Sequence, residues 1–266
     1  MQKYNILVTG AFSGIGKEFV RAYLENPSNY IFAIDKDVPS EALLSADAKY
    51  AARRKLEEYR NDIGDPLSGD AMSGRVAVSG MDITEEASVA HLDALRGLEI
   101  VIHCAGVRGL VPSVSVIEGS DVAGAETMDV MTSKTMLQTF RTNSMGTFLL
   151  IRAVVPVLRS NGGKAVIMGS RMGSIGHNIT GGGYAYRASK AALNALVKSF
   201  SVDVPEACFA IVHPGRVESN LVGAGVREDG AITAEESVKD MLQLISRFRR
   251  EDSGRFTDRF GDNIEW

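Results

Sequence analysis

Short apolar runs alternate with longer amphipathic stretches along almost the whole chain. Runs of about four to eight apolar residues bounded by glycine or polar residues are typical of buried strands, and stretches with apolar positions three or four residues apart are typical of helices. The pattern predicts strands at residues 4–8, 30–34, 75–79, 98–104, 164–168, 208–212 and 254–257. It predicts helices at residues 17–24, 42–62, 86–96, 133–160, 186–197 and 233–250.

This alternation predicts an α/β protein with a Rossmann-type, doubly wound parallel sheet of about seven strands and helices on both faces. We expect a single domain over residues 1–266, with insertions near residues 37–74 and 107–130 and a flap near residues 217–232 that borders a substrate pocket. Ligands of such sheets bind at the carboxyl ends of the strands.

Composition and charge narrow the function classes. The 266 residues are 45% hydrophobic and carry a net charge of -4, which gives no sign of attraction to nucleic acid or to a membrane surface. No apolar run reaches the ~18–20 residues that a membrane span needs. Two cysteines, Cys104 and Cys208, are too few for a disulfide framework, and no signal peptide precedes the first strand. We therefore expect a cytoplasmic protein.

A glycine-rich turn follows the first strand and leads into the first helix. Gly10, Gly14 and Gly16 have the spacing G-x-x-x-G-x-G. Such glycines allow a tight turn and close approach of the backbone to a pyrophosphate, while the helix N-terminus supplies amide donors. The turn predicts a dinucleotide site.

Acidic residues follow the second and third strands. Asp35 could accept hydrogen bonds from the adenosine ribose and would repel a 2′-phosphate, which favours NAD over NADP. Lys36 beside it could partly accommodate that phosphate. Asp82 could hold the adenine edge or cap the helix that follows it, and these two interpretations are compatible.

A tyrosine and a lysine lie one turn apart on the helix predicted at residues 186–197. Residues four apart share a helix face, so the Tyr186 phenol and the Lys190 ammonium should be neighbours. A nearby cation lowers the pKa of a phenol from its usual value of about 10, which suits a general acid or base. A half-buried tyrosine beside a solvated lysine would give the same pattern.

Three further polar positions are candidates for a role in the site. Asn143 lies inside a predicted helix close to Gly146, an unfavourable position that suggests it bends the helix or holds a water. Ser170 follows the fifth strand, where its hydroxyl could bind a substrate oxygen. His103 and Cys104 should point to opposite faces of their strand, so we predict no metal site.

Taken together, these residues resemble the short-chain dehydrogenase/reductase family, and within it the C-factor-like branch. The branch resemblance rests on residues 170–176, 186–194 and 261–266. The family motifs cover nearly the whole chain in the family's order: Thr9-Gly10-x-x-x-Gly14-x-Gly16, Asp82-Ile83, Cys104-Ala105-Gly106, Asn143, Ser170, Tyr186-x-x-x-Lys190 and Pro214-Gly215.

The resemblance implies an NAD(P)-dependent oxidoreductase that transfers a hydride between a nicotinamide cofactor and a small-molecule carbonyl/alcohol pair. Tyr186 would be the general acid/base, and Lys190 would lower its pKa and hold the nicotinamide ribose. Ser170 would position the substrate oxygen, and Asn143 would support a water in a proton relay.

The resemblance also implies a set of cofactor-binding residues and an oligomeric state. Asp35 and Ser13 imply NAD over NADP, and the family implies a homodimer or homotetramer built on the long helices. The implied cofactor-binding residues are Gly10, Ser13, Gly14, Ile15, Gly16, Asp35, Asp82, Ile83, Cys104, Ala105, Gly106, Tyr186, Lys190, Pro214, Gly215 and Val217.

The sequence departs from the family pattern at the support of the adenine side and at the flap with its substrate contacts. His103 stands where the family usually has asparagine, and Arg216, Ser219 and Asn220 stand where the branch more often has Trp, Thr and Asp. The substrate therefore stays open. Arginines at positions 108, 171 and 187 could favour an acidic substrate or could lie on the surface.

Two other functions stay open. The same fold and cofactor could serve a dehydratase, isomerase or cyclase, or the chain could be a cofactor-binding regulatory or signalling protein.

Overall fold

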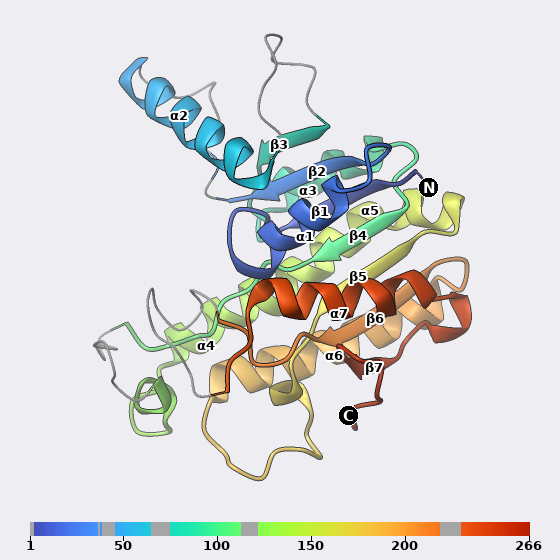
Figure 1. The fold of residues 1–266 in the computed structure, drawn as a ribbon. Coiled ribbons are helices and arrows are strands. Elements are labelled where there is room, and N and C mark those ends of the chain that lie inside the picture. Colours follow the sequence, from blue (N-terminus) through green and yellow to red (C-terminus); the bar gives the residue numbers. More distant parts are fainter. Residues whose placement is uncertain (1–2, 37, 39–45, 65–74, 113–121, 219–229) are drawn as a thin grey trace.

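The computed structural model describes residues 3–36, 38, 46–64, 75–112, 122–218 and 230–266. Seven parallel strands form one sheet in the order β3-β2-β1-β4-β5-β6-β7 (Figure 1). This architecture confirms the predicted fold class. The strands are β1 (Asn5–Thr9), β2 (Tyr30–Asp35), β3 (Val76–Gly80), β4 (Ile100–His103), β5 (Lys164–Met168), β6 (Cys208–His213) and β7 (Phe256–Asp258).

Helices connect these strands. The α-helices are α1 (Gly14–Leu24), α2 (Ala46–Ile63), α3 (Glu86–Val89), α4 (Ser133–Phe140), α5 (Thr147–Asn161), α6 (Tyr184–Asp203) and α7 (Ala234–Arg247). Short 3₁₀ helices are η2 (Ala90–Ala94), η3 (Val122–Glu126), η5 (Arg171–Gly173) and η7 (Arg250–Asp252), and η4 (Arg141–Gly146) is a π-helix. Among the described residues no helix is long and apolar enough to cross a membrane.

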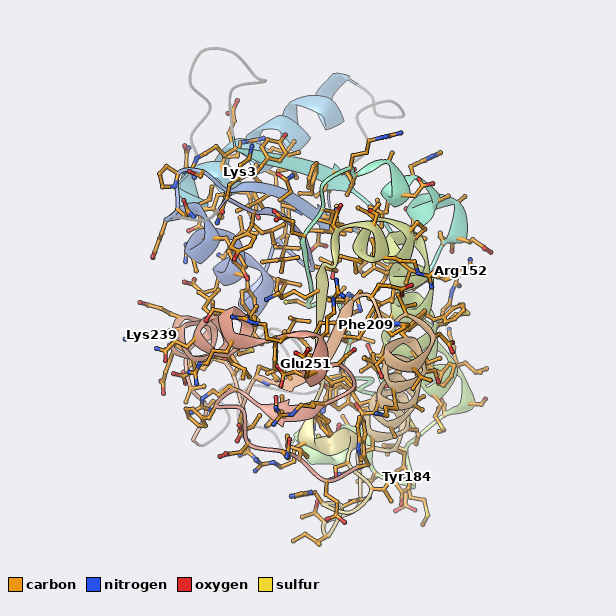
Figure 2. The ribbon with its side chains drawn as sticks, turned by 90° about the vertical axis from the view of Figure 1, so that its right-hand side faces the viewer. Lys3, Arg152, Tyr184, Phe209, Lys239 and Glu251 are labelled. Carbon is orange, nitrogen blue, oxygen red and sulfur yellow. The ribbon has the colours of Figure 1, made fainter. Side chains whose placement is uncertain are left out.

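Both faces of the sheet are buried, which explains why its strands are continuous apolar runs. Ile6 and Val8 of β1 pack into one apolar cluster with α1, α7 and the end of α2, whereas Leu7 between them packs into a second cluster with α5 and α6. Figure 2 shows the two helix layers, with Lys239 of α7 and Arg152 of α5 on opposite sides of the sheet.

The strand order reverses at β1, which pairs with both β2 and β4. At this switch point the connections after β1 and β4 leave toward opposite faces, and a crevice forms at the carboxyl ends. Thr9 lies opposite His103 in the register of β1 and β4, so the glycine turn lies beside the turn that follows β4. The topology therefore brings the predicted site segments to one edge.

Several predicted elements differ in detail from the structure. The helix predicted at residues 86–96 is a short α3 followed by η2, and the one predicted at 133–160 is interrupted by the π-helix. The helix predicted at 233–250 ends at Arg247, because the chain turns extended at the buried Phe248. Residues 42–45, part of each predicted insertion and most of the predicted flap lie outside the described residues.

The π-helix η4 packs closely against the Ile83 side chain, in the segment that follows β3. A Cβ atom at Gly146 would lie 2.9 Å from Cγ1 of Ile83, so only glycine allows this approach. Asn143 and Ser144 are buried in the same turn and hydrogen-bond Ser189 of α6. The unfavourable sequence of this segment therefore coincides with a widened turn, of the kind that often occurs at functional sites.

Candidate active site

The glycine turn forms an open cradle at the start of α1. Gly10 and Gly14 have left-handed backbone conformations, with φ of 64° and 48°. A Cβ at Gly10 would lie 2.9 Å from the Ala105 amide nitrogen, and one at Gly16 would lie 2.1 Å from the Gly10 carbonyl oxygen. At Gly14 no atom of the described residues lies within 4 Å of that position. The backbone thus packs tightly behind the turn and leaves space in front of it, as a diphosphate requires.

A cavity of about 770 Å³ lies in front of this cradle. Its volume and its backbone donors fit the diphosphate and adenosine part of a dinucleotide. The predicted cofactor residues that line it are Gly10, Ser13, Gly14, Ile15, Gly16, Asp35, Asp82, Ile83, Cys104, Ala105 and Gly106.

The acidic residues of this cavity also hold the backbone around it. Oδ2 of Asp35 accepts a hydrogen bond of 3.2 Å from the amide of Phe12 in the glycine turn. Oδ1 of Asp82 accepts one of 2.8 Å from the amide of Thr84, in the turn that leads to α3. Lys36 and Lys55 line the same cavity as Asp35. The cavity therefore offers both a carboxylate and cations near the expected ribose.

Helix α2 contributes residues that sequence reasoning missed. The Tyr59 ring stacks on Phe12 with centroids 4.0 Å apart, and its hydroxyl donates a 3.0 Å hydrogen bond to the carbonyl of Ala11. Lys17 of α1 forms an ion pair of 2.7 Å with Asp62. No motif marks Tyr59 or Lys55, because only the tertiary packing of the insertion brings them to the glycine turn.

His103 connects the two central strands to the π-helix. Its Nδ1 lies 2.7 Å from the Thr9 hydroxyl, and its Nε2 lies 2.8 Å from the Thr147 hydroxyl. Thr147 donates its proton to the Asn143 carbonyl, so Nε2 carries the ring proton and Nδ1 accepts from Thr9. Burial, with a smaller effect of Lys190, lowers the pKa of His103 to about 3, so the ring is neutral.

Asn143 uses its side chain to hold the turn after β4. Its Oδ1 accepts a 2.8 Å hydrogen bond from the Val107 amide, while its Nδ2 donates to the Val107 carbonyl at 2.8 Å and to the Ser189 hydroxyl at 2.9 Å. Asn143 is fully buried. It therefore positions the backbone of the site, and its support of a relay water stays a prediction.

Ser170, Tyr186 and Lys190 come together at the carboxyl end of β5. The Ser170 hydroxyl accepts a hydrogen bond of 3.2 Å from the Met172 amide, and Ser170 and Tyr186 line the same cavity. Nζ of Lys190 lies 5.7 Å from the centre of the Tyr186 ring and donates a 2.8 Å hydrogen bond to the Met168 carbonyl. Burial lowers the pKa of Lys190 to about 8, so the ammonium remains largely charged at neutral pH.

The pKa of Tyr186 differs from the sequence-based expectation. Burial raises it, although Arg108 and the hydrogen bond from Ser170 lower it in part and Glu126 raises it further. The phenol is buried, and the desolvation of its anion outweighs the nearby positive charge. The cation that lowers this pKa most is Arg108, not Lys190 as predicted.

Arg108 is fixed above the reactive tyrosine by a buried ion pair. Its guanidinium lies 4.9 Å from the centre of the Tyr186 ring. Two of its nitrogens contact the Glu126 carboxylate, at 2.9 and 2.8 Å. The carbonyl of Glu126 accepts a hydrogen bond from Gly183, the residue that precedes α6. The pair thus links the segment after β4 to the start of the tyrosine helix.

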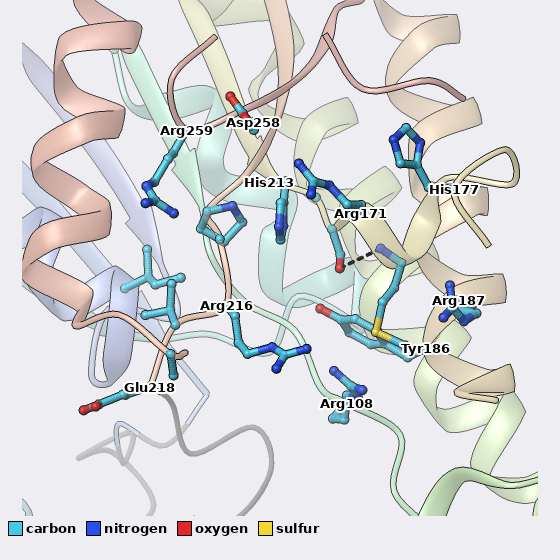
Figure 3. Close-up of a pocket in the computed structure, with 18 of the residues that line it drawn as sticks. Arg108, Arg171, His177, Tyr186, Arg187, His213, Arg216, Glu218, Asp258 and Arg259 are labelled. Carbon is cyan, nitrogen blue, oxygen red and sulfur yellow. Dashed lines mark hydrogen bonds between the residues drawn. The ribbon is translucent and has the colours of Figure 1, made fainter. Parts of the chain in front are cut away.

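A second cavity, of about 610 Å³, surrounds Ser170 and Tyr186 (Figure 3). Pro214, Gly215 and Val217, predicted to bind cofactor, line it as well. Ile15 and Arg108 line both cavities, which therefore adjoin. Asn143 and Lys190 lie buried beneath them. Among the described residues no group of three or more His, Cys, Asp or Glu could hold a metal ion.

Comparisons with known proteins agree with this geometry. A family model described as short chain dehydrogenase matches residues 4–229. The C-signal of Myxococcus xanthus is 36% identical over 172 residues, which are 64% of this chain and 93% of that protein. The 1-hydroxy-2-glutathionyl-2-methyl-3-butene dehydrogenase of Rhodococcus sp. (strain AD45) is 32% identical over 203 residues, 74% of this chain and 83% of that one.

Solved structures extend the likeness to the whole chain. The NADPH-bound carbonyl reductase from chicken fatty liver superposes with a TM-score of 0.74 and 25% identity, with all of both chains covered. The carbonyl reductase Sniffer of D. melanogaster superposes with a TM-score of 0.73 and 24% identity over all of both chains, a likeness of fold.

Proposed function

The chain belongs to the short-chain dehydrogenase/reductase family, an oxidoreductase family that binds a nicotinamide cofactor, and we propose that it transfers a hydride between NAD and a small-molecule carbonyl/alcohol pair. Tyr186 is the general acid/base of this reaction. When bound, the cofactor supplies or accepts the hydride.

One observation carries the proposal: a phenol and a hydroxyl line one cavity that adjoins the glycine cradle. Ser170 and Tyr186 can both contact one substrate oxygen there, at the carboxyl end of β5. In the reductive direction Tyr186 protonates the oxygen, and in the oxidative direction it removes that proton. Lys190, buried and charged beneath the turn at Gly106, is placed to hold the nicotinamide ribose.

Tyr186→Phe tests the acid/base role. It removes the exchangeable proton and keeps the ring packing, so we expect the ketone reductase activity with NADH to fall by about 10²–10⁴ while NADH affinity changes little. Activity is followed by NADH absorbance and affinity by NADH fluorescence. Full activity in this variant would refute the assignment.

The same variant separates the alternatives. A relative of this chain is named C-signal, which supports keeping a signalling function in view. A cofactor-binding regulator should retain its function in Tyr186→Phe. A dehydratase, isomerase or cyclase is distinguished by the wild type, which should then convert its substrate without a net change in NADH.

Asp35 supports a preference for NAD. Its carboxylate lies at the end of β2, at the expected ribose position, and would repel a 2′-phosphate. Lys36 and Lys55 in the same cavity act in the opposite direction, and the chicken carbonyl reductase carries NADPH. We expect tighter binding of NADH than of NADPH, and Asp35→Ala should remove most of that preference. Tighter binding of NADPH by the wild type would refute the preference for NAD. It would indicate that Lys36 and Lys55 bind the 2′-phosphate.

The remaining assignments concern the protein as a whole. We propose that residues 1–266 form one domain of a cytoplasmic homodimer or homotetramer that does not act on nucleic acid. Exposed apolar side chains on α4, among them Leu137 and Phe140, support self-association. Cys104 and Cys208 are both free, which agrees with a reducing compartment.

A further inference from the structure

The cavity around Ser170 and Tyr186 is rich in arginine although the chain is acidic. The whole sequence has 29 basic and 33 acidic residues. Among the described residues, the lining of this cavity contains two carboxylates, from Glu218 and Asp258, and five guanidinium groups, from Arg108, Arg171, Arg187, Arg216 and Arg259. The excess of positive charge is therefore local to the cavity.

Part of this charge is neutralised within the protein. Arg108 pairs with Glu126, and Arg259 pairs with Asp240 at 2.8 Å. Oδ1 of Asp258 accepts hydrogen bonds from three backbone amides, at residues 260–262. These groups hold the cavity wall together. Arg216 lies between Gly215 and Val217, which are predicted to bind the cofactor. A cation there is suited to the negative charge of the cofactor diphosphate.

Two arginines differ from these, and each directly follows a reactive residue. Arg187, after Tyr186, donates to neutral acceptors, the Gly182 carbonyl and the Thr180 hydroxyl. Arg171, after Ser170, has an exposed side chain that forms no hydrogen bond or ion pair within the described part of the chain. Neither therefore forms an ion pair with a carboxylate of the described residues, although Glu126 acts on Arg187 through its charge.

Arg171 points into the cavity. Figure 3 shows its side chain beside His213, and Arg171 lines the same cavity as Ser170 and Tyr186. Burial, and after it Arg171, lowers the pKa of His213 to about 4, so the imidazole is neutral and adds no charge beside the guanidinium. A guanidinium in this position is suited to binding an oxyanion through two parallel hydrogen bonds.

We propose that the substrate carries a carboxylate or phosphate group, which Arg171 binds while Ser170 and Tyr186 contact the carbonyl or alcohol oxygen. Arg187 adds to the positive potential that attracts such a substrate. This inference rests on the proposed oxidoreductase function and specifies the chemical class of its substrate.

Matched pairs of ketones test this selectivity. The full chain is assayed with NADH on 4-oxopentanoate against its methyl ester, and on hydroxyacetone phosphate against hydroxyacetone. We expect kcat/KM to be about tenfold or more higher for the anion in at least one pair, because a charge-assisted hydrogen bond contributes that much to binding. The pair with the larger ratio distinguishes a carboxylate from a phosphate. The ratio should fall as ionic strength rises.

Variants assign the selectivity to the residue. Arg171→Met should reduce the ratio at least tenfold, mainly through KM of the anion, and Arg171→Lys should retain part of it. Arg247→Met, which removes one exposed arginine on α7 far from the cavity, should leave the ratio unchanged. Equal turnover of anion and neutral ketone by the wild type would overturn the inference, as would an unchanged ratio in Arg171→Met.

A binding measurement separates this inference from the proposed function. If no ketone is reduced, the proposed function fails, and the thermal shift produced by 4-oxopentanoate and hydroxyacetone phosphate against their neutral partners then decides the inference. Stabilisation by an anion alone, lost in Arg171→Met and kept in Arg247→Met, supports it. No difference between the anionic and neutral compounds overturns it.

Discussion

Arg108 and Glu126 place opposite charges close to a single phenol. The guanidinium above the Tyr186 ring lowers the pKa of that phenol, and the carboxylate that orients the guanidinium raises it. Both side chains are largely buried, at 17% and 7% exposure, so solvent screens these effects less than at the surface. The acidity of Tyr186 therefore depends on a pair that lies outside the Tyr-x-x-x-Lys motif.

The two members of this pair should shift the pH dependence of the reaction in opposite directions. In alcohol oxidation Tyr186 acts as phenolate, so kcat/KM rises as pH passes its pKa. Arg108→Gln removes the cation and should move this rise to higher pH, whereas Glu126→Gln removes the anion and should move it to lower pH. Shifts in the same direction would show that the pair affects Tyr186 by holding the structure and not by its charges. The measurement is a pH profile of NAD reduction for the three proteins.

His103 should make stability sensitive to acid. Its pKa is about 3 in the folded protein, against an ordinary value of 6.5. Below pH 6.5 the unfolded chain binds a proton that the folded chain does not, so stability falls as pH decreases through this window, by up to about 1.4 kcal/mol per pH unit. His103→Asn removes that titration. Urea unfolding between pH 7.5 and 5 should show a steeper loss in the wild type, and equal slopes would contradict the assignment.

At the scale of elements, α2 acts as part of the cofactor site. Its Tyr59 contacts the glycine turn through both a ring stack and a hydrogen bond, and its Lys55 lines the adenosine cavity. The π-helix η4 has a comparable role on the other side of the sheet, because Asn143 fixes the turn after β4. Both elements shape the cavities by holding backbone segments.

Tyr59 provides a test of this role. Tyr59→Phe removes only the hydrogen bond to Ala11 and should raise the dissociation constant of NADH about threefold to tenfold, since a hydrogen bond contributes about 0.5–1.5 kcal/mol. Tyr59→Ala also removes the stack and should weaken binding further. Tyr30→Phe, on the partly exposed side of β2, is the matched control. Unchanged NADH affinity in both Tyr59 variants would limit α2 to a structural role.

At the scale of the whole molecule, one sheet edge carries both cavities. The carboxyl ends of β1, β2 and β4 border the larger cavity, and those of β5 and β6 border the smaller one, so a dinucleotide can extend from the glycine turn to Tyr186. Helix α4 leaves apolar side chains uncovered, with Leu137 70% and Phe140 47% exposed.

Self-association should therefore depend on α4. We expect light scattering to give the mass of a dimer or tetramer for the wild type, and Leu137→Glu to lower it, because a buried charge without a partner is costly. Lys239→Glu on α7, on the other face of the sheet, should not change it. A monomeric wild type would refute the oligomer prediction and leave the active-site proposal intact.

The sequence alone determined the order of elements, the sheet class and the edge at which the site lies. Apolar runs such as residues 164–168 matched their strand in full, because a strand buried on both faces must be continuously apolar. The glycine turn, Asp35, Ser170 and Tyr186 could be placed from local pattern, since each lies at or just after the end of a strand or in the first turn of a helix.

Only the tertiary structure decided the electrostatics and the contacts between distant segments. Arg108 reaches Tyr186 and Tyr59 reaches Phe12 from positions 78 and 47 residues away in the sequence, and no local periodicity encodes such pairs. The raised pKa of Tyr186 likewise depends on burial, which the packing of α6 against the sheet sets. Local pattern specifies which residues end a strand, whereas solvent exclusion and charge pairing arise only when the elements pack together.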